Sequence, residues 1–148
     1  MESDVKLVEM VAAADCLPHG PGIRLIDGAV IDEDRATAQM LPLAGRTLVL
    51  SDHFPGQPVT PGCLVIEALA QTAICLVAGR PELLDSLFLL RTVEAKFRKP
   101  LDQTDTPTLL VQLERLRPKH GVVRGLVYLG KDQIASVKIV FAITPKKA

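Results

Sequence analysis

At residues 61–78 the sequence reads PGCLVIEALAQTAICLVA, and this run indicates the centre of the fold. After Pro61-Gly62 it contains no proline or glycine, and Leu, Ala and Ile dominate a length that suits a helix better than a strand. Its polar side chains are those of Glu67, Gln71 and Thr72. The sequence therefore predicts a helix over Cys63–Ala78 that is buried on most of its faces.

The segments on either side of this helix have the patterns of strands. Ile23–Ile31 and Arg35–Leu43 predict two strands around an acidic turn, whereas Val5–Ala14 is compatible with a short helix. From Leu87 to Ile143 apolar and polar side chains alternate with no helical interruption, which is typical of an antiparallel meander. We therefore expect a single α+β domain over residues 1–148, with an antiparallel sheet covering one central helix.

The composition argues against nucleic acids and membranes as partners. Lys plus Arg and Asp plus Glu both total 17, so the formal net charge is zero, and aromatic residues make up 3% with no tryptophan. Such a chain lacks the positive field and the stacking rings typical of nucleic-acid binders. No apolar run approaches the ~18 residues of a membrane span, and the acidic start does not resemble a signal peptide. We expect a cytoplasmic protein that binds no nucleic acid and inserts into no membrane.

The cysteines and two of the histidines give no sign of a metal site. Cys16, Cys63 and Cys75 have no metal-ligand spacing, so we expect reduced thiols, with Cys63 and Cys75 packed as small hydrophobic side chains. His19 and His120 also have no partner at such a spacing and are predicted to be structural or solvated. The sequence therefore predicts no metal.

Chemistry is expected where a stiff loop meets the central helix. Residues 53–62 read HFPGQPVTPG, and the prolines and glycines fix the backbone at some positions and free it at others, which can hold the His53 imidazole still. The first amides of the helix have no intrahelical acceptor, so its N terminus near Gly62 attracts developing negative charge. A base and an oxyanion site can therefore lie side by side.

Glu67 is a candidate acid about one turn into the helix. Its neighbours are apolar and offer no charge partner, and burial of that kind favours the protonated carboxyl group that a general acid needs. A structural ion pair with a basic residue elsewhere is the alternative interpretation. Gln71 follows four residues later on the same face, where its amide either orients the carboxyl group or fills a core contact.

The run from His53 to Gln71 closely resembles the 3-hydroxyacyl-[acyl-carrier-protein] dehydratases of fatty acid biosynthesis, the FabZ-like enzymes. The likeness extends to Leu17-Pro18-His19, to the KFRKP run at residues 96–100 and to the terminal strand. It implies the hot dog fold, an antiparallel sheet wrapped around a long central helix. It also implies a hydro-lyase of lipid metabolism that converts a (3R)-3-hydroxyacyl group on acyl carrier protein into a trans-2-enoyl thioester without a cofactor.

The resemblance also implies roles for individual residues. His53 would remove the α-proton, Glu67 would protonate the departing hydroxyl, the amide of Gly62 would bind the thioester oxygen, and Gln71 would support the carboxyl group. In this family the His and the Glu come from different subunits, which implies a homodimer or a multiple of dimers. A group of basic side chains either steers the acidic carrier and its phosphopantetheine arm or forms a solvated strand edge. These side chains are Arg91, Lys96, Arg98 and Lys99.

Two short segments depart from the family pattern. Gly20-Pro21-Gly22 stands where Arg-Tyr-Pro is common, and Gln103-Thr104-Asp105 stands where Pro-Gly-Asp is common, so the substrate tunnel and its rim are expected to differ. Two other functions are weighed against the dehydratase: a hot dog acyl thioesterase, and a non-catalytic dehydratase-like protein that binds carrier-bound chains. The retained His53 and Glu67 favour the dehydratase over both.

Overall fold

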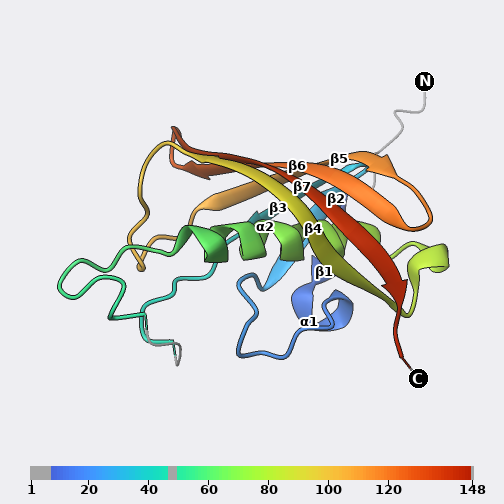
Figure 1. The fold of residues 1–148 in the computed structure, drawn as a ribbon, viewed down its shortest axis with the longest axis horizontal. Coiled ribbons are helices and arrows are strands. Elements are labelled where there is room, and N and C mark those ends of the chain that lie inside the picture. Colours follow the sequence, from blue (N-terminus) through green and yellow to red (C-terminus); the bar gives the residue numbers. More distant parts are fainter. Residues whose placement is uncertain (1–7, 47–49, 148) are drawn as a thin grey trace.

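The protein is built around one long helix. The computed structural model describes residues 8–46 and 50–147. Helix α2, Gly62–Val77, is enclosed by a curved antiparallel sheet, with the short helix α1, Ala13–Cys16, and a 3-10 turn at Pro81–Leu83 beside it (Figure 1). The predicted α+β class is confirmed. No helix of the described chain is both long and apolar enough to cross a membrane.

The sheet has seven strands in the order β1-β2-β3-β5-β6-β7-β4. Their bounds are Glu9–Ala12 for β1, Gly28–Asp32 for β2, Arg35–Gln39 for β3, Ser86–Phe97 for β4, Thr108–Leu116 for β5, His120–Leu129 for β6 and Asp132–Pro145 for β7. Short turns join β5 to β6 and β6 to β7, so these strands pair as hairpins.

Strand β4 corrects the prediction of a simple meander. Residues 98–107 separate it from β5, and this connection is too long for a tight hairpin, so β4 pairs with β7 instead. It therefore lies at one edge of the sheet, with β1 at the other. Its outward edge has no strand partner among the described residues, which matters for assembly.

The helix prediction is confirmed within one residue at each end. Val65, Ala68, Leu69 and every residue from 71 to 77 are buried. The apolar ones among them join the inward side chains of β5, β6 and β7 in one hydrophobic core. This burial is the main reason that the helix is stable, because removing apolar area from water stabilises by about 25 cal/mol per Å². Cys75 is buried as predicted, but Cys63 is exposed, so the prediction that it packs as a hydrophobe is wrong for the single chain.

The N-terminal half departs from prediction in three places. The described part of the predicted helix Val5–Ala14 is mainly strand β1, because its backbone pairs with β2 and this pairing overrides local preference. Residues 5–7 lie outside the described part. The strand predicted at Ile23–Ile31 begins only at Gly28, and the one predicted at Arg35–Leu43 ends at Gln39. The backbone groups of Ile23 and Leu25 instead bond to a side chain of α2.

Candidate active site

His53 lies in the loop that precedes α2, and a tight turn begins directly after it. The amide of Phe54 donates to the carbonyl of Gln57 at 2.7 Å, and the reverse bond closes at 2.8 Å. Pro55 and Gly56 occupy the two central positions, and Gly56 has a φ of +74°, a conformation that glycine adopts without the Cβ strain of other residues. The loop prediction from proline and glycine is confirmed at this turn.

The imidazole of His53 has one nitrogen engaged and one available. Nδ1 lies 3.0 Å from the carbonyl oxygen of Val59. A carbonyl can only accept, so the proton is on Nδ1 and is donated, which leaves the lone pair of Nε2 free to accept a proton. The ring also stacks on Phe54, with centroids 4.4 Å apart. This tautomer and orientation are those that a general base requires.

A cavity of about 330 Å³ lies beside His53. Gly62 and Val65 line it from α2, and Phe97, Arg98 and Lys99 line it from the end of β4. The Phe97 ring lies so close to Gly62 that a Cβ there would be 3.1 Å from the ring, so a residue without a side chain fits this position. No side chain caps the N terminus of α2, and its first amides have no intrahelical acceptor.

Glu67 has two polar neighbours, of which the sequence predicted Gln71 but not His19. Its Oε1 is 3.1 Å from Nε2 of His19 and accepts a 3.0 Å hydrogen bond from Nε2 of Gln71. The side chain is 33% exposed in the single chain. The expectation of a carboxyl group buried among apolar side chains is therefore wrong for the single chain, because the loop that follows α1 brings the polar His19 ring against this face of the helix.

The sequence left open whether Gln71 contacts Glu67 or fills a core position, and in the structure it does both. It is fully buried, its Oε1 accepts from the amide of Leu25 at 2.8 Å, and its Nε2 donates to the carbonyl of Ile23 at 2.9 Å. These two backbone partners fix which end of the amide is which. The nitrogen end therefore points at Glu67, where it can only donate.

His19 is the site residue that sequence reasoning missed. Its Nδ1 is buried and has no hydrogen-bond partner among the described residues. A proton there would be an unpaired buried donor, which costs about 1–3 kcal/mol, so the neutral ring carries its proton on Nε2 and donates it to Glu67. The only sequence signal for this residue is the Leu-Pro-His run, and its distance from Glu67 along the sequence does not indicate that the two side chains meet.

Within one chain the two candidate catalytic side chains lie on different sides of α2. Val65 lines the cavity beside His53, and Glu67 is two residues further, which is about 200° around the helix. Glu67 does not line that cavity, and its polar partners are Gln71 of α2 and His19 from the segment before β2. A single chain thus holds a half-site for the base and a half-site for the acid that do not face each other.

Comparison with known proteins identifies the family. A family model described as a FabA-like domain matches residues 45–138. The chain is 30% identical to the 3-hydroxyacyl-[acyl-carrier-protein] dehydratase FabZ of Pelotomaculum thermopropionicum over 131 residues, covering 87% of this chain and 94% of that one. It is 33% identical to the FabZ of Chloroflexus aggregans, covering 86% and 90%. The chain belongs to the FabA-like dehydratase family. The predicted family and the predicted hydro-lyase reaction are confirmed.

A solved structure confirms the architecture of the family. The dehydratase heterocomplex ApeI:P from Xenorhabdus doucetiae matches with a TM-score of 0.76 at 17% identity, covering 92% of this chain and 93% of that chain. At that identity the likeness concerns the fold alone. Together with the family match it confirms the predicted hot dog fold.

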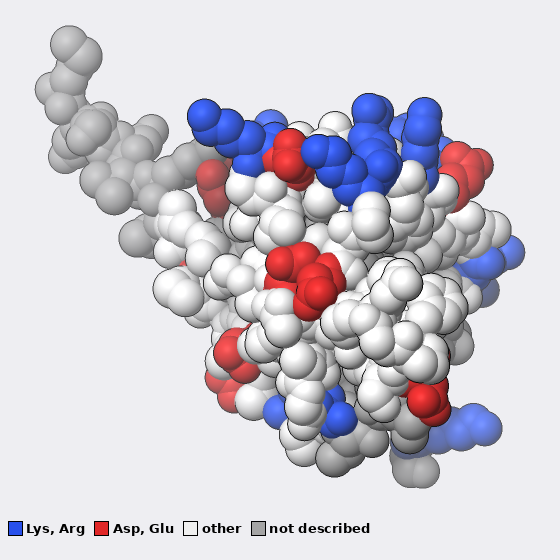
Figure 2. All heavy atoms as spheres, turned by 90° about the vertical axis from the view of Figure 1, so that its left-hand side faces the viewer, with Lys and Arg blue, Asp and Glu red and all other residues white. Residues whose placement is uncertain are grey.

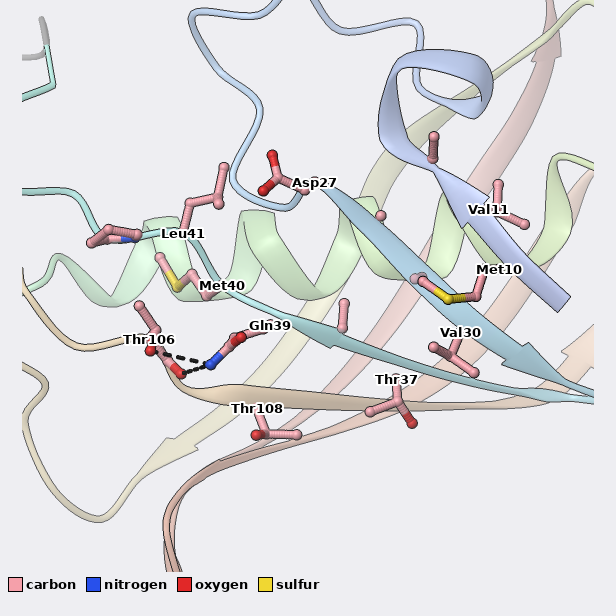
Figure 3. Close-up of a pocket in the computed structure, with 15 residues that line it drawn as sticks. Met10, Val11, Asp27, Val30, Thr37, Gln39, Met40, Leu41, Thr106 and Thr108 are labelled. Carbon is pink, nitrogen blue, oxygen red and sulfur yellow. Dashed lines mark hydrogen bonds between the residues drawn. The ribbon is translucent and has the colours of Figure 1, made fainter. Parts of the chain in front are cut away.

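A second, larger cavity of this dehydratase lies away from both half-sites. It measures about 770 Å³ and lies along β1, β2 and β3 (Figure 3). Its visible hydrogen bonds join Gln39 to the backbone and hydroxyl oxygens of Thr106. Among the described residues that line it, Asp27 is the one ionisable group, so it has no acid and base pair for the dehydration. Size alone therefore does not identify the active site.

The loop after β4, where the chain departs from the family pattern, is well ordered by its own polar groups. Asp102 accepts hydrogen bonds from the amide and the hydroxyl of Thr104, and these bonds hold the pKa of Asp102 below its usual range. Asp105 in turn accepts from the amide of Asp102 at 2.8 Å. The turn directs Gln103 inward, where it is 5% exposed. At the segment where the rim is expected to differ, the chain therefore forms a structured turn with a buried amide.

Proposed function

We propose that this protein dehydrates (3R)-3-hydroxyacyl groups on acyl carrier protein to trans-2-enoyl thioesters, with His53 as base and Glu67 as acid. The observation that carries the assignment is the Nδ1 hydrogen bond of His53 to the Val59 carbonyl, because it leaves Nε2 unprotonated. Nε2 takes the proton from C2 of the substrate, and the C2 electron pair forms the double bond as the C3–O bond breaks. No redox change occurs, so no redox cofactor is needed.

Glu67 supplies the proton that turns the leaving hydroxyl into water. Its Oε1 accepts from Gln71 and from His19, so the proton of the neutral carboxyl group is on Oε2. In the proposed mechanism this oxygen donates the proton to the leaving hydroxyl. After water departs, the proton taken by His53 returns through solvent to Glu67, which restores the starting state.

The N terminus of α2 is proposed to bind the thioester oxygen. The amide of Gly62 is in the first turn, and the helix dipole favours the negative charge that develops on this oxygen as the α-proton leaves. Stabilising the enolate-like charge lowers the barrier to proton removal. Gly62 and His53 line the same cavity, which supports this role.

Two copies of the chain are proposed to form each active site. The acid and base half-sites of one chain lie on different sides of α2, so a base from a partner must meet each Glu67. Strand β4 offers the surface for such pairing. It is a twelve-residue edge strand with Leu89, Leu90 and Phe97 exposed by 51%, 57% and 43%, and a long apolar edge of this kind favours pairing with another chain. A homodimer, or a multiple of it, follows.

The acyl carrier protein is proposed to approach near the end of β4. Arg98 and Lys99 are exposed and line the cavity beside His53, and Lys99 also forms a 3.2 Å ion pair with Asp132. Lys and Arg side chains gather along one margin of this end of the molecule (Figure 2). Local positive charge of this kind steers an acidic carrier and its phosphopantetheine arm.

We place this reaction in the cytoplasm, because the three free cysteines agree with a reducing compartment. The pathway that we propose for it is fatty acid synthesis or a related polyene or polyketide synthesis.

The test is conversion of a 3-hydroxyacyl-carrier substrate, followed by mass spectrometry of the intact carrier. Wild type should lose 18 Da from the acyl group, the mass of the water that the reaction removes. His53→Ala and Glu67→Gln should each lower kcat by about 10²–10⁴-fold while the assembled protein stays folded. Free carrier thiol would identify a thioesterase, and binding without conversion would identify a non-catalytic partner. Near-normal dehydration by either variant would overturn the assigned pair.

A further inference from the structure

Gln103 bonds to three other segments around the loop that carries His53. Its backbone amide donates to the carbonyl of Pro58 at 2.8 Å, and its carbonyl accepts from the amides of Leu43 and Ala44. Its side-chain nitrogen lies 2.7 Å from the carbonyl of Leu50. The residue is 5% exposed, so these bonds are shielded from water and are costly to leave unmade.

The two N–H groups of this side chain face three carbonyl oxygens of the loop that carries the base, and those of Leu50 and Val59 are the nearest. Nε2 of Gln103 lies 3.2 Å from the carbonyl oxygen of Val59 and 3.4 Å from that of His53. All the partners of this nitrogen are carbonyl oxygens, which can only accept, so the orientation of the amide is fixed. The amide group therefore acts as a donor at the point where the loop returns to α2.

The carbonyl of Val59 is shared between Gln103 and the proposed base. It accepts from Nδ1 of His53 at 3.0 Å and from Nε2 of Gln103 at 3.2 Å. A carbonyl oxygen has two lone pairs, so both bonds can form together. The position of this oxygen decides which nitrogen of His53 carries the proton, because the tautomer follows the hydrogen bond that the ring makes.

We propose that Gln103 is a positioning residue for the catalytic base. It holds the Val59 carbonyl where Nδ1 of His53 must donate to it, and so keeps Nε2 free to accept the α-proton. This inference rests on the proposed function of His53. It assigns a role to a position where the chain departs from the family pattern, and it explains why a glutamine is buried there. Gln103 itself touches neither substrate nor reacting atoms.

The test compares Gln103→Met, which keeps the length of the side chain and removes its donors, with Gln39→Met, the same change at an exposed glutamine, as a control. Gln39 lies in β3 and its amide bonds to Thr106, away from His53. Gln103→Met should lower kcat about 10- to 100-fold with KM changed by less than about threefold, because a misplaced base slows the chemical step rather than binding. Gln39→Met should retain the wild-type kcat.

Nitrogen chemical shifts of the His53 ring separate positioning from a general loss of structure. In wild type they should report the tautomer protonated at Nδ1, and in Gln103→Met a substantial fraction should shift to protonation at Nε2. A loss of kcat with an unchanged tautomer, or an unchanged kcat, would overturn the proposal.

The wild-type protein alone also provides a decisive measurement. If Gln103→Met does not fold, the ring shifts of wild-type His53 and the hydrogen-exchange protection of the Gln103 side-chain amide still test the inference. A wild-type ring protonated at Nε2, or an unprotected amide, would overturn it. The outcome is independent of the activity assay: a wild type without dehydratase activity removes the proposed function, whereas the tautomer and the protection report on the hydrogen bonds themselves.

Discussion

The His53 loop and the Glu67 face of α2 perform matching tasks by different means. His53 is held by backbone carbonyls in an irregular loop, and the decisive carbonyl is held in turn by a glutamine from the connection between β4 and β5. Glu67 is held by side chains, one of which lies a single helical turn away. The comparison teaches that a helix carries part of its own positioning in its periodicity, whereas a loop depends on distant residues for nearly all of it.

The largest expected effect tests whether the two regions belong to one site in each chain or are shared between chains. His53→Ala and Glu67→Gln are each expected to be nearly inactive, but subunits of both variants that are unfolded, mixed and refolded should form hybrid dimers with one intact site. At equal mixing about one quarter of the wild-type activity should return, since half of the dimers are hybrids. Steady-state rates of the mixture measure this. If the mixture stays as inactive as its components, the site lies within one chain.

The next largest effect is expected when the side chain that holds Glu67 on α2 is replaced. Gln71→Met removes the bonds to the amide of Leu25 and the carbonyl of Ile23, each of which costs about 1–3 kcal/mol when buried and unpaired. Urea unfolding should show this loss, and kcat should fall because Glu67 loses a donor. Thr72→Val is the control, since its hydroxyl is also fully buried but bonds only to the Ala68 carbonyl. Equal stability and activity losses in both variants would contradict the role of Gln71.

A smaller effect isolates the residue that the sequence did not reveal. His19→Asn should lower kcat about tenfold with little change in stability, because one hydrogen bond of about 1.4 kcal/mol to Glu67 is lost. His120→Asn serves as control, since His120 lies in β6 opposite Ala142. Stopped-flow or steady-state rates across pH distinguish the two variants. A kcat equal to wild type in His19→Asn would show that Gln71 alone orients the acid.

The smallest expected effect concerns the stability of the turn after His53. Gly56→Ala should cost about 1 kcal/mol, because an alanine at a φ of +74° is strained although no atom crowds its Cβ. Gly20→Ala also meets no atom within 4 Å, but it has no positive φ, so it should be neutral or slightly stabilising. Thermal unfolding of the two variants gives the difference. A smaller cost at Gly56 than at Gly20 would mean that the turn after His53 relaxes freely.

The predictable parts of this molecule are those whose evidence is local. The apolar composition of residues 63–78 gave the helix to within one residue, and the spacing of Glu67 and Gln71 gave their contact. The predictions were wrong where pairing between distant segments overrides local preference. Strand β1 replaces a predicted helix because β2 pairs with it, and β4 leaves the predicted meander because β7 pairs with it.

The candidate site also has parts that local sequence predicts and parts that depend on contacts between distant segments. By itself, the sequence determined which groups are available: an imidazole, a carboxyl group and a free helix N terminus, since these depend on residue identity and on spacing within one turn. Only the tertiary structure decided which groups meet. His19 and Glu67 are 48 positions apart, and Gln103 and His53 are 50 positions apart. The path of the backbone between such residues is set by the packing of the whole core, which no local pattern encodes.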